Sequence, residues 1–127
     1  MKKGFTLIEL LAVIIILAIV ALVATPIILN VVDDARESAA RSEASMIVSG
    51  VNNYCATAAM KNQLDSTAEN ICADGVDKNE VPTMVNLGNA KVTSITYNPT
   101  SGAVTALEIT SNTFTVTYNG TTFSVSK

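Results

Sequence analysis

The sequence predicts an α+β fold in which a long N-terminal α-helix packs on a four-stranded antiparallel β-meander. Three observations support this prediction: an apolar run that ends near Ala24, a one-sided helical pattern that follows it, and a period of two from Val92 onward. The one-sided helix and the alternating strands each need an apolar surface, and each supplies one to the other. The first half of so long a helix has no partner in a domain this small, so it must pack on lipid or on other copies of itself.

Composition excludes several classes of function. The chain of 127 residues has no histidine and only two cysteines, so the commonest general base is missing and a zinc site lacks ligands. Its eight Lys and Arg residues are scattered and its formal net charge is −3, which is not the basic footprint of a nucleic-acid-binding protein. We also find no nucleotide-binding motif. The sequence therefore predicts no enzyme, no cofactor, no metal ion and no direct binding of nucleic acid.

The apolar N-terminal segment allows three interpretations. A cleaved secretory signal peptide fits poorly, because the small residues needed at a cleavage site are misplaced around Ala21 and Ala24. A plain signal anchor fits the length, since Phe5–Leu29 is long enough to span a hydrocarbon core of about 30 Å. The two lysines before it favour a cytoplasmic N-terminus. Neither interpretation explains why Glu9 lies inside the apolar run.

Glu9 is the most informative residue of this segment. A charged side chain at the centre of a membrane helix costs about 3 kcal/mol on insertion scales, so it normally has a specific partner. Because Glu9 lies near the start of the helix, its side chain can alternatively extend to the membrane interface. The partner hypothesis gives this carboxylate a function, whereas the interface alternative does not.

The third interpretation rests on the motif Lys3-Gly4-Phe5-Thr6-Leu7-Ile8-Glu9-Leu10. This stretch resembles the class III signal of type IV pilins and of type II secretion pseudopilins. The resemblance implies that a prepilin peptidase cuts after Gly4 on the cytoplasmic side of the membrane and that the new N-terminus, Phe5, is methylated. It also implies a division of the chain into a leader at 1–4, a transmembrane and filament-core helix at 5–30, and a globular domain at 31–127.

The resemblance further implies a structural function. Pilins reside in the inner (cytoplasmic) membrane as single-pass precursors, and an ATPase-driven assembly machinery then polymerises them into an extracellular helical filament. In the family, the glutamate matching Glu9 neutralises the N-terminal amine of a neighbouring subunit, here that of Phe5; as a pair, the two charges are tolerable in an apolar bundle. We therefore expect a homo-oligomeric type IV pilus subunit. A pseudopilin of a secretion or competence DNA-uptake system, or a membrane-anchored binding domain, is the alternative.

Pro26 lies inside the apolar run and predicts a kink. A proline in a helix interior removes one backbone hydrogen bond and bends the helix. We expect Thr25 to help satisfy the carbonyl groups nearby. Many pilins carry a proline at the matching place, where the helix can unwind in assembled filaments. A kink in the bilayer and a stretched helix in a fibre therefore both remain open.

From Val31 the helix becomes one-sided and is predicted to reach about Met60, with Gly50 costing about 1 kcal/mol relative to alanine. The predicted buried stripe consists of apolar residues spaced mostly three, four or seven apart: Val32, Ala35, Ala39, Met46, Ile47, Val51, Tyr54 and Ala58. The predicted solvated face carries polar and charged residues: Asp34, Glu37, Arg41 and Asn52.

Residues 61–91 are predicted to be a loop because turn-forming residues dominate them. Cys55 lies on the predicted helix and Cys72 in this loop. An even cysteine count in an exported chain favours one disulfide, which closes a loop of about 18 residues; two buried free thiols are the alternative. The acidic residues of the loop lack the spacing of a calcium-binding loop, so a solvated turn is predicted for them: Asp74, Asp77 and Glu80, with Asn79.

Alternation in the last third predicts four strands at 92–97, 104–110, 113–118 and 121–126. Turns are expected at 98–102 and at 111–112. Asn119-Gly120 is typical of a two-residue type I′ hairpin turn. Such a turn pairs two sets of apolar residues and places all four on the face toward the helix: Val116 with Phe123, and Phe114 with Val125.

Overall fold

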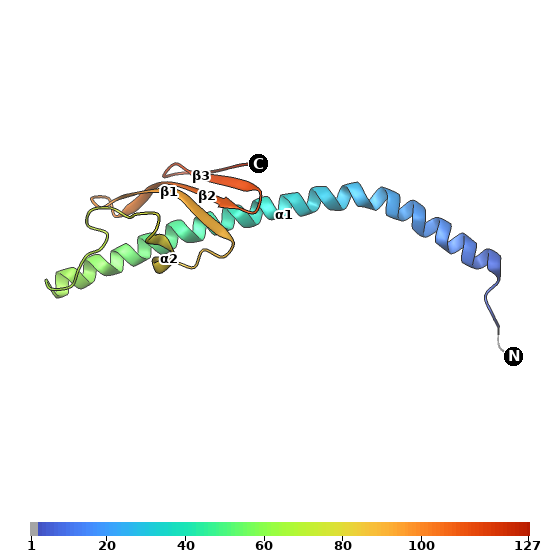
Figure 1. The fold of residues 1–127 in the computed structure, drawn as a ribbon, viewed down its shortest axis with the longest axis horizontal. Helices are drawn as coiled ribbons and strands as arrows, with labels where there is room; N and C mark the ends of the chain where they lie inside the picture. Colours follow the sequence, from blue (N-terminus) through green and yellow to red (C-terminus); the bar gives the residue numbers. More distant parts are fainter. Residues whose placement is uncertain (1–2) are drawn as a thin grey trace. The chain divides into compact units, whose positions relative to one another are not determined.

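The computed structural model describes residues 3–127, and it confirms the predicted α+β architecture (Figure 1). In chain order the elements are α1 (Leu7–Leu64), α2 (Val81–Met84), β1 (Ala90–Asn98), β2 (Ala103–Ser111), β3 (Phe114–Tyr118) and β4 (Phe123–Ser126). The chain divides into two compact units, Met1–Ala35 and Arg36–Lys127.

In the first unit, α1 is not covered by any other part of the described chain. Its most apolar 18-residue window has 0% of its residues buried. Among the described residues, α1 is the one helix long and apolar enough to cross a membrane, as judged by length and composition. Its apolar side chains therefore need a partner that this chain does not provide.

The helix of the first unit continues through Pro26. Pro26 has no amide hydrogen to donate to the carbonyl group of Leu22, four residues earlier. The hydroxyl of Thr25 donates to the carbonyl oxygen of Ala21 at 2.8 Å. Thr25 therefore binds the carbonyl group of Ala21, whereas the carbonyl group that Pro26 leaves without its usual donor is that of Leu22. The predicted help from Thr25 is directed one residue earlier in the chain.

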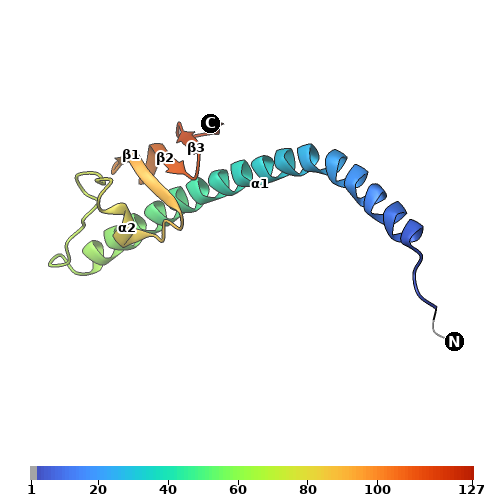
Figure 2. The same ribbon diagram turned by 45° about the vertical axis from the view of Figure 1, so that its right-hand side comes forward.

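In the second unit, the sheet lies along one side of the second half of α1 (Figure 2). All neighbouring strands are antiparallel and follow the order β1-β2-β3-β4, which is the predicted meander. The core lies between helix and sheet. Its fully buried large side chains come from both layers and from α2: Ile47, Val51, Val81, Ile109 and Val116.

The buried side of α1 differs from the predicted stripe. Ile47 and Val51 are buried as predicted, but Met46 is 60% and Tyr54 is 39% exposed. The residues that α1 buries are instead mostly small: Ala40, Ala44, Ile47, Val48, Val51 and Cys55. Small side chains allow the sheet to approach the helix closely, so close packing selects this side over the one with the larger apolar residues.

Two polar residues lie elsewhere than the sequence predicts. Asn52 is half-buried, and its Oδ1 accepts the backbone amide of Val104 on β2 at 2.8 Å. The sequence predicts a turn at Ser111, but this residue ends β2, is 1% exposed and donates its hydroxyl to the carboxylate of Glu43 on α1. Because buried polar groups need partners, these two hydrogen bonds fix the position of α1 against β2.

The predicted loop 61–91 is shorter than expected and contains a helical turn. The helix α1 continues to Leu64, and β1 begins at Ala90 rather than at Val92. In between, α2 begins at Val81 with Pro82 in its first turn, where a proline costs no helical hydrogen bond. The buried side chain of Val81 anchors this turn in the core.

The hairpin between β3 and β4 has a four-residue loop instead of the predicted two-residue turn. Tyr118 pairs with Phe123, so Asn119–Thr122 forms the loop. The side chain of Asn119 accepts the amides of Thr121 at 3.1 Å and of Thr122 at 2.9 Å. These hydrogen bonds from the backbone to the Asn119 side chain stabilise the four-residue loop relative to the two-residue turn.

The wider loop moves the register of β3 and β4 by two residues. Val116 pairs with Val125 rather than with Phe123. A shift of two preserves the alternation of side chains, so the four apolar residues of this hairpin still face the core as predicted. Gly120, at φ +88°, lies beside β2, where a Cβ would be 3.1 Å from the carbonyl oxygen of Thr105.

Gly50 allows the segment after α2 to approach α1. A Cβ at this position would be 2.5 Å from Cγ2 and 3.0 Å from Cβ of Val85. Val85 is β-branched and stiff at χ1, so it cannot rotate away at low cost. The glycine therefore serves close packing.

We expect Gly50→Ala to lower the free energy of unfolding by about 1–2 kcal/mol, because overpacking outweighs the gain of about 1 kcal/mol in helix propensity. Urea denaturation of the full chain in detergent measures this change. In the Gly50→Ala background, Val85→Ala removes the clash. Val85→Ala should therefore lower the free energy of unfolding less in that background than in the wild type. A Gly50→Ala variant more stable than the wild type contradicts the packing argument.

Candidate functional site

The predicted site residues belong to both units. Gly4, Phe5, Glu9 and Pro26 lie in the first unit, whereas the two cysteines lie in the second. Met1 and Lys2, the first half of the predicted leader, lie outside the described residues. The structure brings together Phe5 and Glu9, and separately the cysteines.

Glu9 lies in the first turn of α1 and binds the residue that precedes the helix. The amide and the hydroxyl of Thr6 both donate to Oε2 of Glu9 at 2.8 Å, and the amide of Glu9 donates to the Thr6 hydroxyl oxygen at 3.3 Å. This reciprocal arrangement is a capping box, which satisfies amides that a helix leaves without partners at its N-terminus. The carboxylate also lies at the positive end of the helix dipole.

Sequence reasoning missed Thr6 as a functional residue, although the signal was present. Thr6-Leu7-Ile8-Glu9 fits the Ser/Thr-x-x-Glu pattern directly before an apolar run. Glu9 therefore has a local partner within its own chain. The hydrogen bonds from Thr6 use only Oε2, so Oε1 remains accessible to a further donor.

The surroundings of Glu9 are apolar and uncovered. A surface hollow of about 540 Å³ is lined by Glu9 together with four apolar residues: Phe5, Leu10, Ala12 and Val13. Phe5 itself is 94% exposed. A carboxylate at the edge of an apolar surface is suited to bind a cation that itself lies on an apolar segment. When the carboxylate and the cation pair, their attraction offsets the cost of removing both charges from water.

The peptide bond between Gly4 and Phe5 lies in an accessible, non-helical segment. Residues 3–6 precede α1 and are exposed. Apart from its two chain neighbours, no described residue has an atom within 4 Å of the position that a Cβ of Gly4 would occupy. A peptidase needs a bond that is neither buried nor held in secondary structure, and this bond meets both conditions.

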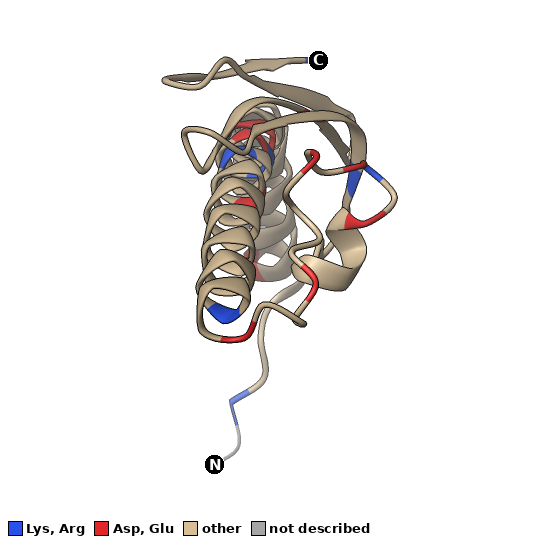
Figure 3. Ribbon diagram, turned by 90° about the vertical axis from the view of Figure 1, so that its left-hand side faces the viewer, with Lys and Arg blue, Asp and Glu red and all other residues tan. Residues whose placement is uncertain are grey.

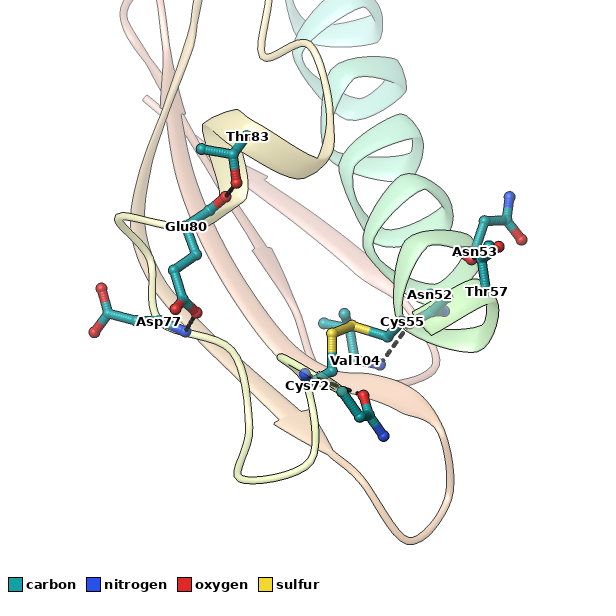
Figure 4. Close-up of a disulfide and its surroundings, with 10 residues drawn as sticks. Asn52, Asn53, Cys55, Thr57, Cys72, Asp77, Glu80, Thr83 and Val104 are labelled. Atoms are coloured by element: carbon teal, nitrogen blue, oxygen red, sulfur yellow. Dashed lines mark hydrogen bonds between the residues drawn. A yellow bond between two sulfur atoms is a disulfide. The ribbon is translucent and has the colours of Figure 1, made fainter. Parts of the chain in front are cut away.

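Cys55 and Cys72 form a disulfide that attaches the loop after α1 to the helix (Figure 4). Their Cα atoms are 5.6 Å apart, and both residues are buried. The side chain of Asn70 accepts the amide of Cys72 at 3.3 Å. The disulfide holds a segment that has little regular structure, so its contribution is to the stability of the second unit.

Acidic residues in this loop bind backbone amides. Asp77 accepts the amide of Asn79 at 2.8 Å, and Glu80 accepts the amide of Asp77 at 3.0 Å. Near the end of α1, the hydroxyl and then the amide of Thr67 lower the pKa of Asp65. No group of three or more His, Cys, Asp or Glu in residues 3–127 is arranged to hold a metal ion.

Comparison with known proteins identifies the N-terminal segment. Residues 1–25 match the model of the prokaryotic N-terminal methylation motif, which is the class III signal peptide of type IV pilins. The same comparisons found no match among curated proteins or solved structures. The motif and the fold together fit a precursor of the pilin or pseudopilin class, anchored in the membrane by α1, and suggest a structural subunit rather than an enzyme.

We expect Thr6→Ala to loosen the first turn of α1, because losing an N-cap side chain costs about 1 kcal/mol and raises amide exchange there about fivefold. Hydrogen exchange at residues 7–9 of the full chain in detergent micelles measures this effect. Thr6→Ser should restore protection, and Thr25→Ala, on the same helix, should leave it unchanged. Equal exchange in Thr6→Ala and the wild type would show that the capping box has no stabilising effect.

Proposed function

We propose that this chain is the precursor of a structural subunit of a type IV pilus filament. A prepilin peptidase cuts it after Gly4, the new N-terminus at Phe5 is methylated, and the assembly machinery polymerises the product through the apolar part of α1. The observation that carries the proposal is the methylation motif at residues 1–25, located on a helix whose apolar surface the chain leaves uncovered.

The uncovered helix is suited to two successive environments, a lipid bilayer and then a bundle of helices. Leu7–Asn30 provides about 36 Å of helix at 1.5 Å per residue, enough for the hydrocarbon core of a bilayer. Apolar side chains point in all directions around it, so a bundle of such helices buries them equally well. The precursor therefore resides in the cytoplasmic membrane, and the processed subunit resides in an extracellular filament.

Glu9 supports a specific contact between subunits. Cleavage after Gly4 creates a positive amine at Phe5, and an ammonium group without a partner is costly in an apolar bundle. The free Oε1 of Glu9 accepts the amine of a neighbouring subunit while Oε2 continues to cap its own helix. Each incoming subunit thus docks at a defined height, where its charge meets the opposite one.

The motif is equally compatible with a pseudopilin of a type II secretion or competence DNA-uptake system. The difference between these assemblies is the length of the fibre. Electron microscopy of material sheared from the cell surface separates them, because a pilus gives long fibres and a pseudopilus does not.

Mass spectrometry of the mature protein should find an N-terminus at methylated Phe5. The accessible bond after Gly4 and the motif around it lead to this expectation. Gly4→Val adds a branched side chain at the bond to be cut and should abolish processing, leaving the precursor in the membrane. Exported protein that retains Met1, Lys2 and Lys3 would refute the pilin-type function.

Two substitutions separate the roles of Glu9. Glu9→Gln keeps an oxygen that can cap the helix but removes the charge, whereas Glu9→Ala removes both. We expect both variants to be processed and to remain in the membrane, while filament yield falls about a hundredfold or more, because one charge of a buried pair loses its partner.

Filament yield in sheared fractions and cleavage at Phe5 are measured together. Asp34→Asn is the matched control, because it removes one carboxylate at an exposed position of the same unit, and it should assemble normally. Normal filaments from Glu9→Gln would show that the charge does not direct assembly.

A further inference from the structure

The loop between β3 and β4 contains a reactive pair of residues that the proposed function does not use. Asn119-Gly120 is the one place in the sequence where an asparagine precedes a glycine. In such a pair the backbone nitrogen of the glycine can attack Cγ of the asparagine side chain and close a five-membered ring. Glycine has no Cβ, so its own side chain does not hinder this nitrogen. The surroundings of the two residues decide whether the attack is favoured.

The carbonyl oxygen of the Asn119 side chain accepts three hydrogen bonds. Its Oδ1 accepts the amide of Thr121 at 3.1 Å, the amide of Thr122 at 2.9 Å and the hydroxyl of Thr122 at 3.3 Å. Attack on Cγ turns this oxygen into an oxyanion, and donors directed at a developing negative charge stabilise the transition state. The three donors are therefore arranged as an oxyanion hole for ring closure at Asn119.

The attacking nitrogen of Gly120 is available for the reaction. Within residues 3–127, no hydrogen-bond acceptor is bound to its amide, so no hydrogen bond inside the chain has to break before the nitrogen reacts. All four residues of the loop, 119–122, are exposed. Water therefore reaches both the nitrogen, which must lose a proton, and the ring that forms.

The charge of this part of the chain does not oppose the reaction. A carboxylate close to the nitrogen disfavours a second negative charge there and so hinders the loss of its proton. Residues 109–126 contain no Asp, Glu, Lys or Arg, and Figure 3 shows no red in the ribbon that leads to the C-terminus. The amide of Gly120 thus has no acidic neighbour along its own hairpin.

We infer that Asn119 is a site of self-catalysed deamidation in the folded chain. The Gly120 nitrogen gives its proton to water and forms a bond to Cγ of Asn119; the bond from Cγ to Nδ2 then breaks, and Nδ2 takes up a proton and leaves as ammonia. Water opens the succinimide ring at either of its two carbonyl groups, which gives aspartate or isoaspartate at position 119. No oxidant, metal ion or second protein takes part, so the inference does not depend on the proposed function.

The reaction changes the surface of the sheet. A neutral amide becomes a carboxylate, so the net charge of −3 becomes −4, and the new charge is the first one within residues 109–126. Isoaspartate also lengthens the backbone by one carbon in a loop with little free space, because a Cβ at Gly120 would be 3.1 Å from the carbonyl oxygen of Thr105. This surface therefore becomes more negative as the protein ages.

Deamidation is measured over time on the full chain in detergent micelles at neutral pH. Trypsin cuts after Lys91 and releases the peptide 92–127. Tandem mass spectrometry locates the replacement of NH2 by OH at position 119 in this peptide, and an isoaspartyl methyltransferase detects the isoaspartate product. We expect the folded chain to react about tenfold faster than the chain unfolded in urea, because only the folded loop holds the three donors on Oδ1.

Substitution of one donor tests the oxyanion hole directly. Thr122→Ala removes the hydroxyl donor and should slow deamidation about threefold, the effect of one hydrogen bond, whereas Thr122→Ser should restore the rate. Thr113→Ala is the matched control, because it makes the same change at an exposed position at the other end of β3, and it should react like the wild type. An unchanged circular dichroism spectrum shows that each variant is folded.

Two results would overturn the inference. One is deamidation that is as fast or faster in urea than in the folded chain, which means that the loop protects Asn119 instead of promoting its reaction. The other is an equal rate in Thr122→Ala and Thr113→Ala, which means that the donors on Oδ1 do not assist ring closure. A faster reaction in the folded chain together with a slower one in Thr122→Ala supports it.

Discussion

The apolar surface of the first half of α1 is the constraint on which the rest of this molecule depends. No described part of the chain covers it, and side chains such as Leu7 and Leu22 are more than three-quarters exposed. Exposing apolar surface to water costs roughly 25 cal/mol per Å², so this segment is stable only in lipid or against other protein. A membrane precursor and a helical assembly are two solutions to the same problem. The second unit needs only the remaining half of the helix for its own core.

Glu9 gives this apolar segment a site for a specific polar contact. Its carboxylate caps the helix through Thr6, so it has hydrogen-bond donors even before any subunit binds. This explains how a charge is tolerated at the start of a membrane helix. Under the proposed function, the second carboxylate oxygen is left for the amine that the proposed cleavage creates, so one side chain serves both the proposed precursor and the proposed contact in the filament.

The second unit is fixed to one side of α1 by contacts of several kinds. Asn52 and Glu43 form hydrogen bonds to β2, the disulfide holds the loop, and Gly50 admits Val85. All of them lie on or beside the buried side of the helix. Folding of the second unit therefore uses one side of this half of the helix.

The sequence by itself determined the fold class, the helix, the four strands, the cysteine pair and the methylation motif, because these depend on hydrophobic period and on short local patterns. Only the tertiary structure decided which side of α1 is buried, where Ser111 lies, and how β3 pairs with β4. Those features depend on the close approach of small residues such as Ala44 and on the hydrogen bonds of Asn119. Apolar period predicts that a helix has a buried side, but the fit between two packed layers determines which side it is.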